Sequence, residues 1–174
     1  MSDLKSRITI AEGDITKLDV AAVVNAANER LTRGGGVCGA IHEAAGRELA
    51  EACRKIGGCP TGQARLTPGF KLKAKYVIHA VGPIWDGGAH QEDVLLADAY
   101  RNSLELARQH KLPSIALPAI STGIYGFPLG RATGIAVETV ADFLRAHELP
   151  KRVIFSCFGD DVAELYRKAL ADLG

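Results

Sequence analysis

Two glycine-rich segments of this chain have the composition of anion-binding loops. Residues 34–39 (GGGVCG) and residues 121–127 (STGIYGF) each precede a stretch with helical periodicity. A helix N-terminus presents unpaired backbone N–H groups and the positive end of the helix dipole, and both favour a bound phosphate. One such loop is a weak signal, but two in one chain of this size indicate a diphosphate held between them. The alternative for residues 34–36 is a plain turn without a ligand.

The first glycine-rich segment also fits, by its letters alone, a dinucleotide-binding fingerprint. Gly34, Gly36 and Gly39 satisfy G-x-G-x-x-G. That fingerprint begins at the end of a strand, whereas residues 29–33 intervene here, and no Asp or Glu closes a following strand to hold ribose hydroxyls. The chain has no G-x-x-x-x-G-K-[ST] sequence either, which excludes a P-loop NTPase. The loops therefore indicate a phosphate site of another kind.

Cys38 and His42 lie one helical turn apart at the start of the helix that follows the first loop. A free thiol has a pKa of ~8.5, and a helix N-terminus lowers it. Paired with His42, a Cys38 thiolate would act as a nucleophile or a base. The alternative is that Cys38 is a small polar residue lining the site and that His42 packs behind it. Of the two nearby asparagines, we expect Asn25 to be structural and to hold the loop.

The elements that must position these loops are short apolar strands and amphipathic helices. Five strand segments are apolar without alternation, which is typical of strands buried on both faces. A sixth, residues 63–67, alternates and is more exposed. Apolar spacings of three and four residues predict helices over residues 41–56, 96–107, 133–144 and 162–173, the last capped by Asp160. The five apolar strands are predicted at residues 7–11, 20–24, 76–81, 114–120 and 152–158.

Alternating strands and helices predict a three-layer α/β/α sandwich with a mixed, mostly parallel central sheet. The sheet is expected to be mixed because residues 63–67 and 76–81 follow one another without a helix between them. Residues 1–174 contain no linker or repeat, so we expect a single domain. Ligands of such sheets bind at the carboxyl ends of the strands, where both glycine-rich loops would lie.

Composition excludes several classes of protein. Lys plus Arg number 21 and Asp plus Glu number 20, so a general nucleic-acid or membrane-surface binder, which needs a basic excess, is not expected. No apolar run reaches the ~18 residues of a membrane span, and the N-terminus lacks a signal segment, so we expect a cytoplasmic protein. Four cysteines without a C-x-x-C pair, and five scattered histidines, indicate buried reduced thiols and no metal site.

Four motifs, in order along the chain, resemble those of the macrodomain family. They are residues 13–16 (GDIT), 25–28 (NAAN), 34–46 (GGGVCGAIHEAAG) and 118–128 (PAISTGIYGFP). The likeness extends from about residue 8 to the last helix and is greatest to the MacroD-type branch, which includes bacterial O-acetyl-ADP-ribose deacetylases. It implies the macrodomain fold, an ADP-ribose site without a further cofactor, and a hydrolase. The implied substrates are O-acetyl-ADP-ribose and proteins carrying mono-ADP-ribose on acidic side chains.

The resemblance also assigns roles to individual residues. Asp14 would accept a hydrogen bond from the adenine amino group, and Phe158 would pack on adenine. Asn28 would bind the terminal ribose hydroxyls, and Tyr125 would flank that ribose. From the residues alone, Asp14 is equally a turn or cap residue and Phe158 a core residue. Catalytic roles would fall to Asn28, Cys38 and His42. The full set of implied ligand contacts is Asp14, Ile15, Asn28, Gly35, Gly36, Val37, Ser121, Thr122, Gly123, Ile124, Tyr125 and Phe158.

The chain departs from the family pattern at one position. Catalytically active members usually carry an Asp after GGGV, where this chain has Cys38. A protonated thiol is a poor base, so water would instead be oriented by Asn28, by loop amides and by the phosphates of the ligand. The departure keeps a second hypothesis open, a module that binds ADP-ribose without turnover. Phosphatase action on an ADP-ribose phosphate is weaker, because no nucleophile or metal cluster is visible.

Overall fold

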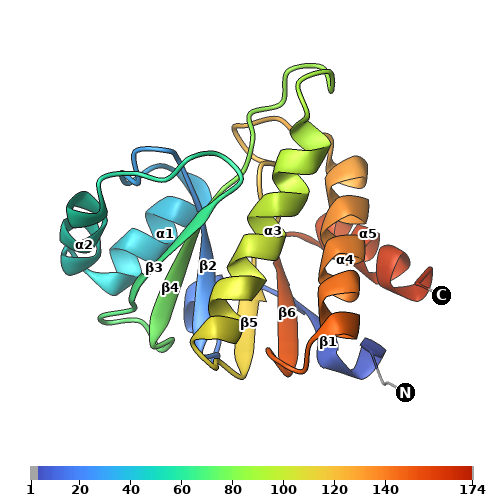
Figure 1. The fold of residues 1–174 in the computed structure, drawn as a ribbon, viewed down its shortest axis with the longest axis horizontal. Helices are drawn as coiled ribbons and strands as arrows, with labels where there is room; N and C mark the ends of the chain where they lie inside the picture. The colour runs from blue at the N-terminus through green and yellow to red at the C-terminus, as the bar shows by residue number, and fades with distance from the viewer. Residues whose placement is uncertain (1–3, 174) are drawn as a thin grey trace.

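A six-stranded sheet forms the centre of the computed structural model, which describes residues 4–173 (Figure 1). The strands lie side by side in the order β1-β6-β5-β2-β4-β3. All neighbours are parallel except β3 and β4, which run antiparallel. The predicted mixed, mostly parallel sheet is therefore confirmed. The strands are β1 (Ile8–Glu12), β2 (Ala22–Ala27), β3 (Ala64–Pro68), β4 (Tyr76–Val81), β5 (Ser114–Leu117) and β6 (Arg152–Cys157).

Helices cover both faces of this sheet, which explains why its strands read as continuous apolar runs. One apolar cluster lies between the sheet and α3, α4 and α5, and a second lies between the opposite face and α1 and α2. The three-layer architecture is confirmed. Two 3₁₀ helices, η1 (Leu4–Arg7) and η2 (Ile15–Lys17), flank β1. The α-helices are α1 (Gly36–Ala45), α2 (Glu48–Ile56), α3 (Glu92–Gln109), α4 (Leu129–Ala146) and α5 (Asp160–Ala171).

The prediction of one helix over residues 41–56 is wrong, because the helix is interrupted at Gly46. This residue has φ +89° and ends α1, and α2 begins two residues later at Glu48. Apolar spacing continues across the break because both helices pack on the same cluster. Asp160 is not the cap of α5 either. The N-cap is Gly159, whereas the Asp160 carboxyl shares a hydrogen bond with Glu12, which raises its pKa.

Two strands also end elsewhere than predicted. β2 continues to Ala27, where it still pairs with Val81 of β4. β5 ends at Leu117 because, beyond it, the backbone bonds the hydroxyl of Tyr100 in place of a neighbouring strand. That hydroxyl donates to Pro118 O (3.1 Å) and accepts from Ile120 N (3.0 Å). A buried tyrosine on α3 thus decides where the chain leaves the sheet.

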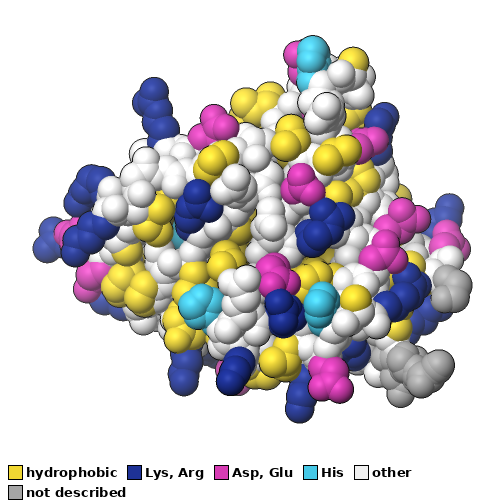
Figure 2. All heavy atoms as spheres, in the orientation of Figure 1, with side chains coloured by type: hydrophobic (Ala, Val, Ile, Leu, Met, Phe, Trp, Pro, Cys, Tyr) yellow, Lys and Arg dark blue, Asp and Glu magenta, His cyan; other side chains and the backbone are white. Residues whose placement is uncertain are grey.

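The surface mixes charges of both signs. In the view of Figure 2, Lys and Arg side chains gather along the left and lower margins, and acidic and apolar side chains are interspersed across the face. All four cysteines are buried and free, as predicted. No helix within residues 4–173 is long and apolar enough to cross a membrane.

Candidate functional site

The loops that follow β1, β6, β5, β2 and β4 all emerge at one edge of the sheet, where these parallel strands end. At one end of this edge, Gly13 N donates to Cys157 O (3.1 Å). This bond brings the next residues of the two loops, Asp14 and Phe158, into the same neighbourhood. At the other end, the loops after β2, β4 and β5 enclose a pocket. Strand order therefore spreads the predicted site residues along a line.

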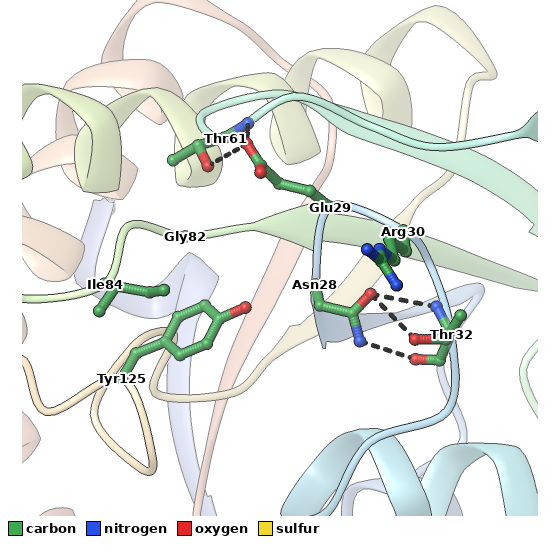
Figure 3. A pocket seen from close by; sticks show the side chains of 8 residues that line it. All are labelled: Asn28, Glu29, Arg30, Thr32, Thr61, Gly82, Ile84 and Tyr125. Atoms are coloured by element: carbon green, nitrogen blue, oxygen red, sulfur yellow. Dashed lines mark hydrogen bonds between the residues drawn. The ribbon is translucent and has the colours of Figure 1, made fainter.

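The pocket has a volume of about 260 Å³ and lies over the ends of β2 and β4 (Figure 3). Asn28 and Tyr125, both predicted to flank the terminal ribose, face each other across it. Burial raises the pKa of the Tyr125 hydroxyl, which keeps it protonated. The pocket is lined by Asn28, Glu29, Arg30, Thr32, Thr61, Gly82, Ile84 and Tyr125.

Asn28 holds the loop after β2 in shape. Its Nδ2 donates to Thr32 O (2.9 Å), and its Oδ1 accepts from Thr32 N (3.1 Å) and from Thr32 Oγ1 (3.3 Å). The loop then reaches α1, whose N-cap Gly35 supplies no side-chain cap, and the next residue, Gly36, has φ +54°. Val37 is half-buried in the first turn. The backbone N–H groups of this helix start therefore remain available to an anion.

Cys38 lies beneath the same loop and is 5% exposed. Its sulfur accepts from Gly34 N (3.4 Å) and donates to Thr32 O (3.7 Å), so the thiol closes the loop rather than lining the pocket. Burial lowers the pKa of His42, and the charge of Arg33 lowers it further. A neutral His42 does not favour the ionised thiolate–imidazolium pair.

Asn25 is structural, as predicted, but the prediction that it holds this loop is wrong, because Asn25 lies within β2 and its buried side chain bonds a neighbouring strand. Its Nδ2 is 3.0 Å from Nδ1 of His79, its register partner on β4. His79 Nε2 is 3.0 Å from Thr67 Oγ1 on β3. Burial lowers the pKa of His79 to about 3, with a smaller electrostatic contribution from the nearby imidazole of His42, so the His79 imidazole is neutral. Asn25 therefore joins three strands, and Asn28 holds the loop.

The loop after β5 turns its backbone outward. Ser121 has φ +69° and is buried, and its Oγ donates to Pro83 O (2.7 Å) in the loop after β4. Thr122 Oγ1 donates to Ala119 O (2.9 Å). A Cβ placed on Gly123 would meet no atom within 4 Å. Both hydroxyls are bonded within or between loops, and Thr122 N donates to Ala119 O, so the groups left for a ligand are the backbone N–H groups of Gly123 and Ile124. The side chain of Ile124 is 92% exposed.

A buried carboxylate that the sequence analysis missed fixes the loop after β4. Glu92 is 1% exposed and accepts from Asp86 N (2.8 Å), Gly88 N (3.0 Å) and His90 N (2.6 Å). Burial alone would raise the pKa of Glu92, but these backbone N–H groups outweigh it and lower the pKa to about 2. In the same loop, Trp85 N donates to an atom across the site, the carbonyl oxygen of Tyr125 (2.8 Å).

At the β1/β6 end of the edge, the two residues predicted to contact adenine differ in their surroundings, since Asp14 is bonded within its loop and Phe158 is exposed. Asp14 caps η2, accepting from Thr16 N (2.9 Å) and Thr16 Oγ1 (2.7 Å), and these bonds lower its pKa. The cap alternative is therefore confirmed, and the exposed carboxylate still has lone pairs for a ligand. Phe158 is 82% exposed, so the core-packing alternative is wrong. Ile15 is buried in the core, so only its backbone can reach a ligand.

Six pocket residues were not predicted from the sequence. Gly82 and Ile84 directly follow a predicted strand, and that position was a usable signal. Glu29 and Arg30 follow the NAAN motif, but nothing in their types marks them. Thr61 comes from the segment before β3 and is joined to the site by Glu29, whose Oε2 accepts from Thr61 Oγ1 (2.8 Å) and Thr61 N (3.2 Å). Thr32 lies inside the loop that Asn28 closes.

The chain is similar to several known proteins. The sequence profile of the Macro domain family matches residues 24–136, a range that contains every residue lining the pocket. A Macro domain-containing protein of Methanosarcina mazei is 56% identical over 167 residues, covering 96% of this chain and 89% of that protein. The O-acetyl-ADP-ribose deacetylase of Escherichia fergusonii is 53% identical over 175 residues, covering 98% and 99%. A glycine-to-valine variant of the Oceanobacillus iheyensis macrodomain, solved with ADPR, is 42% identical with a TM-score of 0.90, covering 93% and 90%.

Proposed function

Since this chain belongs to the Macro domain family, we propose that it binds ADP-ribose and hydrolyses acyl esters at the terminal ribose. The substrate named first is O-acetyl-ADP-ribose, because a relative 53% identical over nearly the whole chain is called an O-acetyl-ADP-ribose deacetylase. The observation that carries the proposal is the pocket beside the two glycine-rich loops, in which Asn28 and Tyr125 face each other. The same relative favours an enzyme over a module that only binds.

The proposed ligand lies along the edge formed by the strand ends. Adenine packs on the exposed ring of Phe158, and its amino group donates to the Asp14 carboxylate. The diphosphate accepts hydrogen bonds from backbone N–H groups of the loop after β5 and of the α1 N-terminus. The terminal ribose then reaches Asn28 and Tyr125. This order is supported by the strand order, which brings β1 and β6 to one end of the edge and β4 to the other.

The proposed reaction is hydrolysis without a cofactor. A water oxygen forms a bond to the acyl carbonyl carbon, the bond from that carbon to the ribose oxygen breaks, and the ribose oxygen takes a proton. The products are ADP-ribose and the free carboxylic acid. Orientation of the water and stabilisation of the developing oxyanion carry the rate. Asn28, the loop N–H groups and the ligand phosphate orient the water, and N–H donors stabilise the oxyanion. The thiol of Cys38, bonded within its loop, takes no part.

The same ester chemistry extends the proposal to mono-ADP-ribose on acidic protein side chains. The pocket side at Ile84 opens to solvent, since this side chain is 65% exposed, and a protein substrate needs such an opening. We also propose the cytoplasm as the compartment, supported by the four buried free cysteines.

Two measurements on the purified protein test this function. Incubation with O-acetyl-ADP-ribose and with a glutamate-linked ADP-ribosylated protein should release acetate and ADP-ribose, respectively. Calorimetry should show tighter binding of ADP-ribose than of AMP, because AMP lacks the diphosphate that the two loops would hold. Binding without any release would establish the non-catalytic alternative. Equal affinity for ADP-ribose and AMP would remove the loops from the site.

A further inference from the structure

Ile84 stands out among the apolar side chains on the surface. Within residues 4–173, six large hydrophobic side chains are exposed, and Ile84 is the one of these six that lines the pocket. Figure 3 shows it beside the ring of Tyr125, whose hydroxyl end points toward Asn28. An isoleucine that is 65% exposed buries little area in the fold itself, so its apolar surface is available to a ligand.

The position of Ile84 is fixed on both sides by its chain neighbours. The carbonyl oxygen of Pro83 accepts from Ser121 Oγ (2.7 Å), and Trp85 N donates to Tyr125 O (2.8 Å). The next residue, Asp86, donates its N–H to the buried Glu92 carboxylate (2.8 Å). A ligand group that contacts Ile84 therefore meets a surface already in place, and little conformational entropy is lost on binding.

The strand order sets which part of the ligand reaches Ile84. Asp14 and Phe158 follow β1 and β6, the phosphate loop follows β5, and Asn28 follows β2. Ile84 follows β4, one strand further along the same edge. A group attached to the terminal ribose, and extending away from adenine, therefore lies over β4. In an acylated ADP-ribose that group is the acyl chain.

The pocket has an apolar strip for such a chain on the side away from Arg30 and Thr32, which belong with Asn28 to the loop after β2 (Figure 3). The Glu29 carboxylate accepts from Thr61 Oγ1 and Thr61 N, so these bonds hold it against Thr61 and away from the ring of Tyr125. Ile84 and the ring of Tyr125 are the large apolar surfaces that remain. The pocket volume of about 260 Å³ exceeds what an acetyl group beside a ribose needs. Each further methylene in contact with apolar carbon adds favourable transfer free energy.

We propose that Ile84, with Tyr125, forms an acyl-chain subsite and makes the enzyme prefer linear aliphatic acyl esters longer than acetyl, such as propionyl and butyryl esters of ADP-ribose. The inference rests on the proposed function and adds the substrate class. The reaction is the same hydrolysis, and it releases a carboxylic acid one or two methylenes longer. Ile84 is a specificity-determining residue and moves no proton.

The test compares kcat/KM for O-butyryl- and O-acetyl-ADP-ribose in four proteins. The wild type should cleave the butyryl ester faster than the acetyl ester. Ile84→Ala should lose about five- to tenfold on the butyryl ester and no more than about twofold on the acetyl ester, as expected for lost methylene contacts. Ile84→Leu should restore the wild-type ratio. Val94→Ala is the matched control, because Val94 is also aliphatic and 56% exposed but does not line the pocket.

Failure of the acyl-chain subsite and failure of ester hydrolysis give different results. Equal losses on both esters in Ile84→Ala, or a wild-type preference for acetyl, would overturn the subsite and leave the deacetylase function standing. Cleavage of neither ester by wild-type protein that binds ADP-ribose would overturn the hydrolysis and the subsite together. Melting temperatures of the four proteins should agree, since both substituted side chains are exposed.

Discussion

The loops that follow β2 and β4 form opposite walls of one pocket and are held in different ways. In the β2 wall, residues 28–35, neutral groups make the bonds that shape the loop, and Glu29 joins the loop to Thr61. Asn28 bonds Thr32, and the thiol of Cys38, in the first turn of α1, bonds the backbone of Thr32 and Gly34 from beneath the loop. In the β4 wall, residues 82–91, the ionised Glu92 gathers three backbone N–H groups, and further bonds join the wall to the loop after β5.

In the β2 wall the same residue serves ligand binding and loop stability, whereas in the β4 wall the stabilising residue is separate from the ligand contacts. Asn28, which we propose to contact the ribose, is also the residue that shapes its own loop. A change there alters the loop and the ligand contact together. Glu92 does not line the pocket, so a change there acts on the wall alone. The β4 wall and its β5 partner thus provide a firm surface, and the β2 wall provides the reactive end.

The largest effect is expected at the β5 loop that the β4 wall supports. Gly123→Val should fold normally, because a Cβ there meets no atom within 4 Å and the φ of Gly123 lies outside the left-handed region. A β-branched side chain would nevertheless cover the backbone N–H groups offered to phosphate. Loss of those bonds should weaken ADP-ribose binding by about 100-fold or more. Calorimetry on a variant with wild-type circular dichroism measures this, and retained affinity would exclude the loop from the site.

The next effect tests the double role of Asn28. Asn28→Ala should lower ester turnover by about 10- to 100-fold, because the ribose loses its orientation relative to water. The melting temperature should fall as well, since three bonds to Thr32 are lost. Thr32→Ala is the matched control, because it removes only the longest bond, at 3.3 Å. Equal turnover in the two variants would mean that Asn28 shapes the loop and does not touch the ligand.

A smaller effect, on stability, is expected at the β4 wall. Glu92→Gln places an amide where a carboxylate accepts three N–H groups and should lower the melting temperature at pH 7 by roughly 5–10 °C. Asp93→Asn, which breaks only the exposed ion pair with Arg131, should lower it by no more than about 2 °C.

The same variant gives a pH signature. The pKa of Glu92 is about 2 in the folded protein and ~4.3 in an unfolded chain. The stability that the carboxylate contributes is therefore complete above the unfolded-state value and is lost as pH falls towards 2. The gap in melting temperature between wild type and Glu92→Gln should be constant from pH 7 to 5 and should narrow below pH 4. A constant gap down to pH 3 would contradict the assigned role.

The smallest effect is expected at Cys38. Cys38→Ala should change single-turnover ester cleavage by less than about threefold, since the Cys38 thiol bonds Gly34 N and Thr32 O within its loop and does not line the pocket. Cys38→Asp should raise turnover if orientation of water is limiting. A Cys38→Ala protein that binds ADP-ribose and has lost cleavage would instead establish a thiolate, and mass spectrometry of an adduct on Cys38 would then distinguish nucleophile from base.

Local patterns in the sequence were sufficient for the elements and for the loops of the site. Apolar runs located the strands, and spacings of three and four located the helices, because burial of one face or of both determines the spacing of apolar residues along the chain. The two glycine-rich loops were found in the same way, whereas the role of Asn28 followed from the resemblance to macrodomains. The break at Gly46 was missed because the spacing continues across it, and Tyr100 ended β5 from another element altogether.

What the sequence by itself determined is the order of the elements, the layered architecture and which loops reach the ligand edge. Only the tertiary structure decided what each polar side chain does there. Asn25 and Asn28 are the same residue type three positions apart, yet the first bonds His79 on a neighbouring strand and the second shapes its own loop. Glu92 carries no local signal at all, and Ile84 carries only its position after a predicted strand. The physical reason is that burial follows from periodicity along the chain, whereas the role of a hydrogen-bonding or exposed apolar group depends on which distant residues the fold brings beside it.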